Sequence, residues 1–484
     1  MKPFSLSFSA SFTVVRRLPA DYLSFTLDTS LVLGGRWWGA SRQMRRGVAV
    51  DTVTPLDLEQ ERLSFFAKAL APAMLRIGGT EADRVRYQMK KKTPPAETHE
   101  YSMNKARWKL LNRFARKNGL QILFTLSAGP ADRDAAGGWL DGNARELIAH
   151  SVRKGFLVSA WELGNEVNGF PFIHGWPHRV SPLQYSADFQ RLGLLLEELD
   201  PRAIAVGPSS AVWPVIGEPN PILTGLCRGK ASPWLGAVSW HYYPQQSTHG
   251  PIATRRVGKK TMLQARNLDG VLRWTRMVRR ALKLTRHPGV ENWMTETAHA
   301  LYGGEPGLSD TFASTLWWLD ELGLLAREGV DKVFRQALVG ARYGLLDEKT
   351  LTPRPDYWAS FLWKKLMGEV VYPSPLSPKA PRKARAYLHG REGESGVRTL
   401  LLVNVSEKRS FSLVVPGTLR RVYCLQGQTG LCSPVATLNG VPLDDDLIAA
   451  WGRKRTARKY HLTATGDRFV APPLSCSFVE LELT

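Results

Sequence analysis

Cysteine and long apolar runs are both scarce in this 484-residue chain. The four cysteines include no Cys-x-x-Cys pair, which argues against a structural zinc site, and four are too few for a disulfide framework in so long a chain. Cys424 and Cys432 leave both a disulfide and two free thiols open. No apolar run reaches the roughly 18 residues of a membrane-spanning helix, so we expect no membrane span.

The N-terminus also lacks the continuous apolar stretch of a signal peptide. From Phe4 to Val14, apolar residues alternate with serine and threonine, a period of two that is typical of a half-buried strand. None of the next segments looks antiparallel to it. We therefore expect this strand to join a sheet that is built elsewhere in the chain.

Acidic residues are the third scarcity, because 43 Asp and Glu stand against 65 Lys and Arg, a formal net charge of +22 at pH 7. Such a surplus attracts polyanions, which include nucleic acid, anionic membranes, and sulfated or carboxylated polysaccharides. The apolar content of 43% indicates a globular protein with a large core. The length favours two domains over one.

From Tyr22 onward, apolar segments alternate with helical patterns. Many of the apolar segments are continuous runs, as expected for strands that are covered on both faces. Eight such β/α units that close on themselves form a (β/α)8 TIM barrel of the α/β class. The predicted strands are Tyr22–Asp28, Ala73–Gly78, Leu120–Leu126, Val158–Gly164, Ala203–Val206, Gly236–Tyr242, Glu291–Glu296 and Lys332–Leu338. The predicted helices are Leu56–Leu70, Lys105–Lys117, Ala144–Val152, Pro182–Leu199, Asp269–Leu284, Ser309–Arg327 and Pro355–Met367.

After Gly368 the pattern changes to prolines and then to short strand-like segments separated by turns. This predicts a small all-β domain, which supplies the sheet that the N-terminal strand needs. The expected organisation is an N-terminal strand at 1–18, the barrel at 19–370 and the β domain at 371–484. The predicted strands of that domain are Ala386–His389, Thr399–Val405, Phe411–Val415, Arg421–Leu425 and Ser477–Leu483.

Two carboxylates end predicted strands of the barrel. Asn165 and Glu166 follow the fourth strand in the stretch Trp161–Glu166, and Glu296 ends the seventh. Each alone is most simply a solvated acid of the rim. Together, at the end of the barrel where catalytic residues gather, they form the pair that glycoside hydrolysis needs, one protonated and one ionised. Asn165 is placed to hydrogen-bond the 2-hydroxyl of the sugar.

The sixth strand ends in Ser239–Pro244, where a tyrosine can hold the nucleophilic carboxylate ionised and oriented. We favour Tyr243 for this role over simple packing of Tyr242 and Tyr243. The sequence contains no serine nucleophile elbow, His-Glu-x-x-His, phosphate-binding loop or dinucleotide fingerprint. We therefore expect neither a metal nor a cofactor.

Basic residues cluster in three places. Pro251–His287 contains eleven basic residues and one acid, Asp269. We expect its first part, Arg255–Lys260, to lie at the barrel rim and contact a polyanion, and its second part to be the solvated face of an outer helix. The other two clusters are Lys90–Lys92, on the rim side, and Arg453–Lys459, in the β domain.

The chain resembles heparanase and its bacterial relatives, glycoside hydrolase family 79, over nearly its whole length. The stretches that carry the resemblance are YLSFTLDTSL, LRIGGTEAD, WELGNEVNGF, SWHYYP, TETAHALYGGEPGLSDTFA, DYWASFLWKKLMG and LSCSFVELEL. The resemblance implies a retaining endo-β-glucuronidase that acts on heparan sulfate, with Glu166 as acid/base and Glu296 as nucleophile. It further implies that the glucuronate is held by Asp28, Thr80, Asn165, Tyr243, Tyr302, Gly303, Gly304 and Tyr343.

The resemblance also implies a (β/α)8 barrel with a β-sandwich to which the N-terminal strand contributes. The substrate of the family suggests a secreted or extracellular protein, although no signal segment is seen. We expect a monomer that has no nucleic acid as its specific partner. Two alternatives stay open, an exo-acting β-glucuronidase and a non-catalytic polyanion-binding protein.

The chain departs from the mammalian members in three places. Tyr87–Lys105 is short where they carry an excised segment, so we expect one uncut chain with an open cleft. Ser209–Pro214, which contains Trp213 and no charge, replaces their basic residues after the fifth strand. One extra residue lies between Glu296 and Tyr302.

Overall fold

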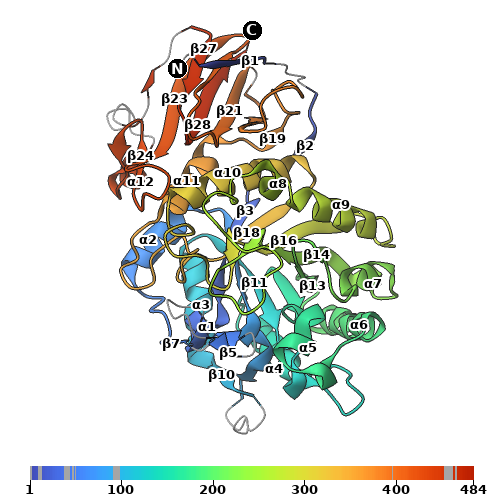
Figure 1. Ribbon diagram of the computed structural model, residues 1–484. Helices are drawn as coiled ribbons and strands as arrows, with labels where there is room; N and C mark the ends of the chain where they lie inside the picture. Colours follow the sequence, from blue (N-terminus) through green and yellow to red (C-terminus); the bar gives the residue numbers. More distant parts are fainter. Residues whose placement is uncertain are drawn as a thin grey trace.

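Figure 1 shows the computed structural model of the chain, with a barrel ringed by helices and a β domain above it. Among the residues that the structure describes, no helix has the length and apolar character needed to cross a membrane. The basic cluster at 453–459, Lys91, Lys92 and positions 9–12 of the predicted N-terminal strand lie outside those residues. The described residues are 3–8, 13–37, 44–45, 48–49, 51–90, 99–394, 396–451, 460, 462–463 and 466–483.

Eight parallel strands close into a barrel in the order β11-β12-β13-β14-β16-β18-β3-β8, which confirms the predicted fold. All eight predicted strands are present. The fifth runs on to Val212, beyond the predicted end at Val206, after a register shift between Gly207 and Ser210 where Pro208 has no N–H to donate. The strands are β3 Leu23–Asp28, β8 Ala73–Gly78, β11 Leu120–Leu126, β12 Ala160–Leu163, β13 Ile204–Val212, β14 Leu235–Tyr242, β16 Glu291–Thr297 and β18 Lys332–Arg335.

One end of the barrel interior is filled by apolar side chains from seven of these strands. The two largest members, Trp293 and Phe334, lie on neighbouring strands with their rings 6.0 Å apart. The cluster consists of Met74, Leu123, Ala160, Val206, Ala237, Trp293 and Phe334. Arg76, Glu162 and Glu296 follow members of this cluster by two or three residues along their strands, so these charged side chains lie nearer the C-terminal rim.

Outer helices surround the barrel (Figure 1). A short helix, α7, was not predicted between the fifth and sixth strands. Helix α10 is buried on all sides because the barrel covers one side and β20, β21 and β28 of the β domain cover the other. The helices are α2 Glu61–Ala69, α3 Lys105–Lys117, α4 Gly142–Arg153, α6 Pro182–Leu199, α7 Ile222–Arg228, α9 Val271–Leu282, α10 Phe312–Arg327 and α11 Pro355–Leu366.

Short helices, 3-10 turns and short strands lie in the segments that connect the main elements, many of them in the loops after the barrel strands. Asp28 caps α1 by accepting a hydrogen bond from the Ser30 N–H. The short helices are α1 Thr29–Leu33, α5 Phe170–Ile173, α8 Ala265–Leu268 and α12 Asp446–Ala450, with 3-10 turns η1 Thr80–Arg84, η2 Pro130–Asp132, η3 Val167–Gly169, η4 Trp176–His178 and η5 Ser232–Trp234. The short strands are β4 Gly35–Trp37, β5 Met44–Arg45, β6 Val48–Ala49, β7 Asp51–Val53, β9 Val85–Gln88, β10 Tyr101–Asn104, β15 Gln245–Gln246 and β17 Ala300–Leu301.

The β domain consists of a nine-stranded sheet and a three-stranded sheet, β1-β22-β27, with an apolar core of its own. The N-terminal segment enters both sheets, since β1 pairs with β22 and β2 pairs with β19. One continuous N-terminal strand was therefore wrong. Phe4 and Val14 are 43% and 40% exposed, so the alternating residues do not all face one core. The strands are β1 Phe4–Leu6, β2 Arg16–Arg17, β19 Val370–Val371, β20 Ala384–Gly390, β21 Val397–Asn404, β22 Phe411–Val414, β23 Thr418–Gly427, β24 Ala436–Leu438, β25 Val441–Pro442, β26 Leu462–Thr463, β27 Arg468–Ala471 and β28 Ser475–Glu482.

Cys424 and Cys432, whose pairing the sequence left open, are both free thiols.

Candidate active site

Glu166 lies on the sharp turn that follows β12. Its backbone has φ 51°, and the preceding Gly164 has φ 70°, a conformation that glycine adopts without strain. A Cβ at Gly164 would also come within 2.6 Å of Val167. The Glu166 N–H donates to the carbonyl of Ser209 on β13, at 2.9 Å, so the turn is fixed to the neighbouring strand.

Glu296 lies near the end of β16, opposite His241 of β14. Its carboxylate accepts one hydrogen bond from Arg76 Nη1, at 3.2 Å, and another from the hydroxyl of Tyr243. The side chain is 9% exposed. The predicted contact of Tyr243 with this carboxylate is present, and both donors stabilise negative charge on Glu296.

The guanidinium of Arg76 is fully buried and connects four strand ends. Besides Glu296, it donates to Glu162 Oε2 at 2.8 Å, Asn165 Oδ1 at 2.9 Å and Ser209 Oγ at 3.0 Å. Burial opposes its charge, but Glu162 and Glu296 outweigh burial and raise the pKa of Arg76. Sequence reasoning missed Arg76, although a lone arginine inside the apolar run Ala73–Gly78 was a signal that a buried charge needs partners.

His241 connects the two carboxylates. Its Nδ1 lies 3.0 Å from Glu166 Oε1 and 3.7 Å from Glu296 Oε2, while its Nε2 lies 2.9 Å from Ser209 Oγ. Burial lowers the pKa of His241 to about 4, so the ring is neutral near pH 7. Ser209 Oγ accepts from Arg76, and its own proton can be donated to Nε2. With the hydroxyl in this orientation the ring proton is on Nδ1 and faces Glu166, which is the tautomer that we assign.

The two predicted catalytic acids meet in one place, where oxygens of Glu166 and Glu296 lie within 4.8 Å of each other. Their surroundings differ. Removal from water raises the pKa of Glu166 to about 7, against a smaller lowering by the charge of Arg76. Glu166, Glu296 and His241 together offer three atoms that could bind a metal ion. The positively charged Arg76, which is hydrogen-bonded to Glu296, opposes a cation at this place.

Apart from Tyr243, the predicted sugar-binding residues fall into two groups beside these acids. Asp28, Thr80 and Asn165 form the first, around Gly79. The Gly79 N–H donates to Asn165 Oδ1 at 3.2 Å, and a Cβ at Gly79 would lie 2.2 Å from Asp28 Oδ2. Burial raises the pKa of Asp28 to about 7, although hydrogen bonds from Ser30 lower it. Thr80 follows Gly79 directly as the first residue of η1.

The second group contains Tyr302, Gly303, Gly304 and Tyr343. The first three have φ of 67°, 77° and 86°, so the backbone curves sharply over three residues. The Gly303 carbonyl accepts from the Arg342 N–H at 2.7 Å, which brings Tyr343 alongside. The ring of Tyr343 lies 6.4 Å from that of Tyr243, whose hydroxyl contacts Glu296. The extra residue before Tyr302 therefore does not move this group away from the acids.

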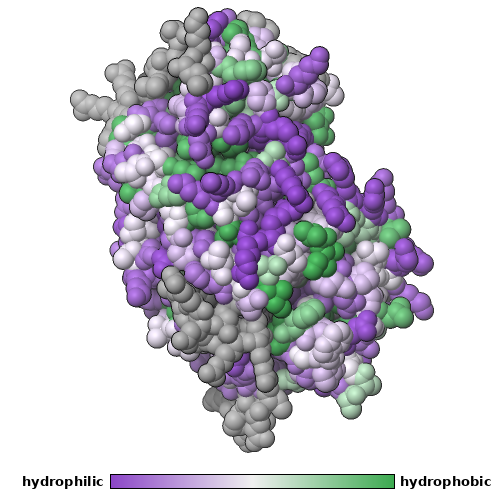
Figure 2. Space-filling model, in the orientation of Figure 1, coloured by the Kyte–Doolittle hydropathy of each residue, from purple (hydrophilic) through white to green (hydrophobic). Residues whose placement is uncertain are grey.

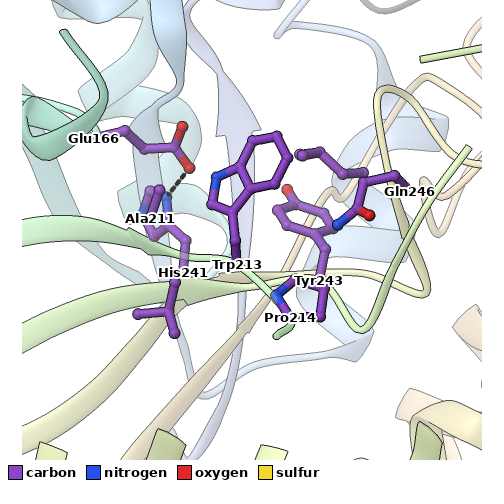
Figure 3. A pocket seen from close by; sticks show the side chains of 9 residues that line it. Glu166, Ala211, Trp213, Pro214, His241, Tyr243 and Gln246 are labelled. Carbon is purple, nitrogen blue, oxygen red and sulfur yellow. Dashed lines mark hydrogen bonds and ion pairs between the residues drawn. The ribbon is translucent and has the colours of Figure 1, made fainter. Parts of the chain in front are cut away.

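A pocket opens onto Glu166 and His241 (Figure 3). Trp213, at the extended end of β13, lies in the middle of this view, between Glu166 and Tyr243. Its ring meets that of Tyr302 edge-to-face at 6.5 Å. The lining residues, which include no lysine or arginine, are Glu166, Ala211, Val212, Trp213, Pro214, His241, Tyr243, Gln246 and Leu301.

Comparison with known proteins agrees with this geometry. Residues 36–323 match the family model described as glycosyl hydrolase family 79, N-terminal domain. Heparanase from Mus musculus is 30% identical over 491 residues, which cover 88% of this chain and 84% of that protein. Inactive heparanase-2 from Mus musculus is 32% identical over 396 residues, which cover 76% and 62%.

Among solved structures, a 4-O-α-L-rhamnosyl-β-D-glucuronidase from Fusarium oxysporum has a TM-score of 0.68 over 99% of this chain and 100% of that one. At 15% identity this similarity shows a shared fold. The family model spans more than half of the chain, and the similarity to heparanase extends well beyond it. The chain therefore belongs to glycosyl hydrolase family 79 and is a glycoside hydrolase of the heparanase type.

Proposed function

We propose that the protein is a retaining endo-β-glucuronidase that cleaves glucuronate linkages in heparan sulfate. The closeness of Glu166 and Glu296 carries the proposal, since one oxygen of each carboxyl group lies within 4.8 Å of the other. Retaining glycosidases hold their carboxyl groups about 5–5.5 Å apart, whereas inverting enzymes need roughly 6.5–9.5 Å to fit a water between them.

In the first step Glu296 attacks the anomeric carbon, and the bond from that carbon to the leaving oxygen breaks. Arg76 and Tyr243 orient Glu296 and stabilise its negative charge before the attack. Glu166 gives its proton to the leaving oxygen. With a pKa raised to about 7 by burial, Glu166 still carries that proton in a large fraction of molecules near neutral pH.

In the second step the same groups work in reverse. Glu166 is now a carboxylate, and it takes a proton from the water that attacks the glycosyl–Glu296 ester. The ester bond to Glu296 breaks, and the sugar leaves with the configuration it began with. The His241 N–H, 3.0 Å from Glu166, is placed to stabilise the carboxylate between the two steps.

The two groups of polar residues beside the acids suit a glucuronate. Asn165, held by Arg76 and Gly79, is adjacent to Glu166 and is placed for the 2-hydroxyl. Asp28 and Thr80 provide further acceptors for hydroxyls. Tyr343 and the curved backbone at Gly303 and Gly304 provide the hydroxyl and N–H donors that a sugar carboxylate requires.

Size analysis of digested heparan sulfate tests the endo assignment. Endo cleavage shortens the chains early in the reaction, and proton NMR should show the β-anomer as the first product. An exo-acting β-glucuronidase is the second candidate, because the Trp213 ring lines the pocket beside Glu166 and is in contact with the Tyr302 ring. Release of monosaccharide without early shortening of the chains would establish the exo activity instead, and an α-anomer as the first product would refute retention.

Two substitutions test the catalytic residues. Glu296→Gln should abolish turnover with the fold intact, which circular dichroism checks. Glu166→Gln should slow cleavage of an alcohol leaving group by about 10²–10⁴-fold. The relatives include a protein named inactive heparanase-2, so a polyanion-binding protein without turnover is the outcome that would replace this proposal.

A further inference from the structure

A line of exposed basic side chains leads from the pocket edge over α8 and along α9. We propose that this line, the basic track, binds an anionic polysaccharide outside the catalytic pocket. The proposal extends the proposed function, because the track would hold a chain that the pocket cleaves. The track consists of Arg256, Lys259, Lys260, Arg266, Arg273, Arg276, Arg280 and Lys283, all of which are exposed.

The track begins beside the catalytic pocket. Gln246, which lines the pocket, is joined to the loop by main-chain hydrogen bonds of 2.9 Å to Arg255 and Val257. Its side-chain oxygen also accepts from the Arg255 N–H at 2.9 Å. The Arg256 guanidinium donates to the carbonyls of Thr248 and Gly250 and is thereby held at the rim. A polysaccharide that leaves the pocket on this side meets the track first at Arg256.

On α9 the track forms a single stripe. Arg273, Arg276, Arg280 and Lys283 are spaced by three, four and three residues, so they share one helix face. The opposite face is buried and consists of Val271, Trp274, Thr275, Val278 and Ala281. Solvated helix faces usually mix charges of both signs, because like charges three or four residues apart repel. α9 contains no acid, and this repulsion is relieved when a polyanion lies along the stripe.

The nearest acid does not neutralise the track. Asp269, the one acid of 251–287, is bonded from the β domain by Arg382 at 2.6 Å and Arg385 at 2.7 Å. Within the described part of the chain, no track residue forms an ion pair with a carboxylate. The same turn of the β domain adds the exposed Lys379 and Lys383. The positive charge of this surface is therefore available to a ligand.

The surface favours a polysaccharide over nucleic acid. Single-stranded nucleic acids are held by aromatic side chains on which bases stack. Trp274 is the one Phe, Tyr or Trp in 251–287, and it is 5% exposed. Figure 2 shows hydrophilic side chains over the part of this face where Figure 1 places α8 and α9. Charge without stacking platforms suits a linear chain of sulfates and carboxylates.

Two fourfold variants test the proposal. The track variant carries Lys260→Gln, Arg266→Gln, Arg276→Gln and Arg280→Gln. The control variant carries Lys105→Gln, Lys109→Gln, Arg116→Gln and Lys117→Gln on α3, a basic helix on another side of the barrel in Figure 1. All eight positions are exposed, and glutamine preserves helix propensity. Each variant loses four positive charges, so a general charge effect would be equal in both.

Heparin binding is measured by titration at several salt concentrations. By the nucleic-acid scale of about 0.7–0.9 per contact, the slope of log Kd against log salt should fall by about three in the track variant. The control variant should keep the wild-type slope, and both should hydrolyse 4-nitrophenyl β-glucuronide as the wild type does. The KM for heparan sulfate should rise in the track variant alone.

The proposal would be overturned if the slope of log Kd against log salt were the same for the two variants. This holds both when neither variant loses affinity for heparin and when both lose it equally. So would duplex DNA that binds as tightly as heparin and is lost with the same four residues, because the surface would then recognise nucleic acid. Binding to heparin requires no turnover. A protein without glucuronidase activity would therefore refute the proposed function while leaving the track to be judged by its binding alone.

Discussion

Glu166 should lose its proton at a higher pH when the ring nitrogens of His241 are removed. The substitution His241→Phe keeps a ring in the buried site and removes the Nδ1 that lies 3.0 Å from Glu166 Oε1. The neutral ring donates to the carboxylate and so stabilises its ionised form. Without that donor the protonated form is favoured, and the pKa of Glu166, about 7 in the wild type, rises further.

The size of the shift follows from one hydrogen bond. A hydrogen bond to a charged group contributes about 1.5–3 kcal/mol. Solvent reaches 21% of the Glu166 side chain, which places the value near the lower limit. At 1.36 kcal/mol per pKa unit, the loss raises the pKa of Glu166 by about one unit. Cleavage needs protonated Glu166 and is lost as pH rises through this pKa. The alkaline limb of the pH–rate profile therefore moves to higher pH by about one unit.

The assay is the pH dependence of kcat/KM for a β-glucuronide whose leaving group is an alcohol. Departure of an alcohol needs a proton from Glu166. The control is 4-nitrophenyl β-glucuronide, whose phenolate leaves without one, so its alkaline limb should be flat or much weaker. Ser209→Ala gives a second test, because it removes the hydroxyl that fixes the His241 tautomer but keeps the ring. Its limb should lie between those of the wild type and His241→Phe.

The direction of the shift decides the reasoning. If protonated Glu166 instead donates to an unprotonated Nδ1, His241 stabilises the acid form and its removal moves the alkaline limb to lower pH. A downward shift would therefore refute the tautomer that Ser209 and Arg76 assign. An unchanged limb would show that His241 does not control the protonation of Glu166.

Three further substitutions have distinct expected outcomes. Tyr243→Phe leaves Arg76 as the donor that Glu296 retains and should lower kcat about 10–100-fold, with unaltered unfolding by urea. Arg76→Met leaves the buried Glu162 and Glu296 without their cation and should lower the free energy of unfolding by about 3–5 kcal/mol. Adding Glu162→Gln should recover part of that loss, whereas wild-type stability of Arg76→Met would contradict the ion pairing. Trp213→Ala should raise KM for the polysaccharide roughly tenfold with little change in kcat, whereas a fall in kcat alone would mean that the ring positions Glu166 rather than the substrate.

The barrel was predictable because its strands are buried on both faces. The seventh strand was predicted as Glu291–Glu296, and β16 extends one residue further, to Thr297. The helix α7 was missed because seven residues are too few to show a helical period. The N-terminal strand was misjudged although its sequence pattern is clear. Its alternation is regular, but β1 and β2 belong to different sheets, and pairing partners are set by tertiary structure.

The site was predictable where a residue ends a strand and has a role at the rim. Glu166 and Glu296 were found in this way, and the structure brings them together. His241 was visible in the sequence only as a neighbour of the tyrosines, since its contacts come from β12 and β13 rather than from β14 itself. No local pattern shows that Ser209 lies within an irregular stretch of β13, with its hydroxyl 2.9 Å from His241 Nε2.

The difference between the two acids comes from the placement of one cation. Arg76 bonds directly to Glu296, whereas the bonds that lead from Arg76 to Glu166 pass through Ser209 and His241. Coulomb attraction falls with distance, so the charge of Arg76 acts strongly on Glu296 and only weakly opposes the burial of Glu166. This difference in distance from Arg76 is what supports the proposed roles, with Glu296 as the nucleophile and Glu166 as the proton donor. The spacing of the two acids is the same whichever of them attacks the sugar. The roles of Glu166 and Glu296 are therefore assigned from their distances to Arg76 and not from their spacing.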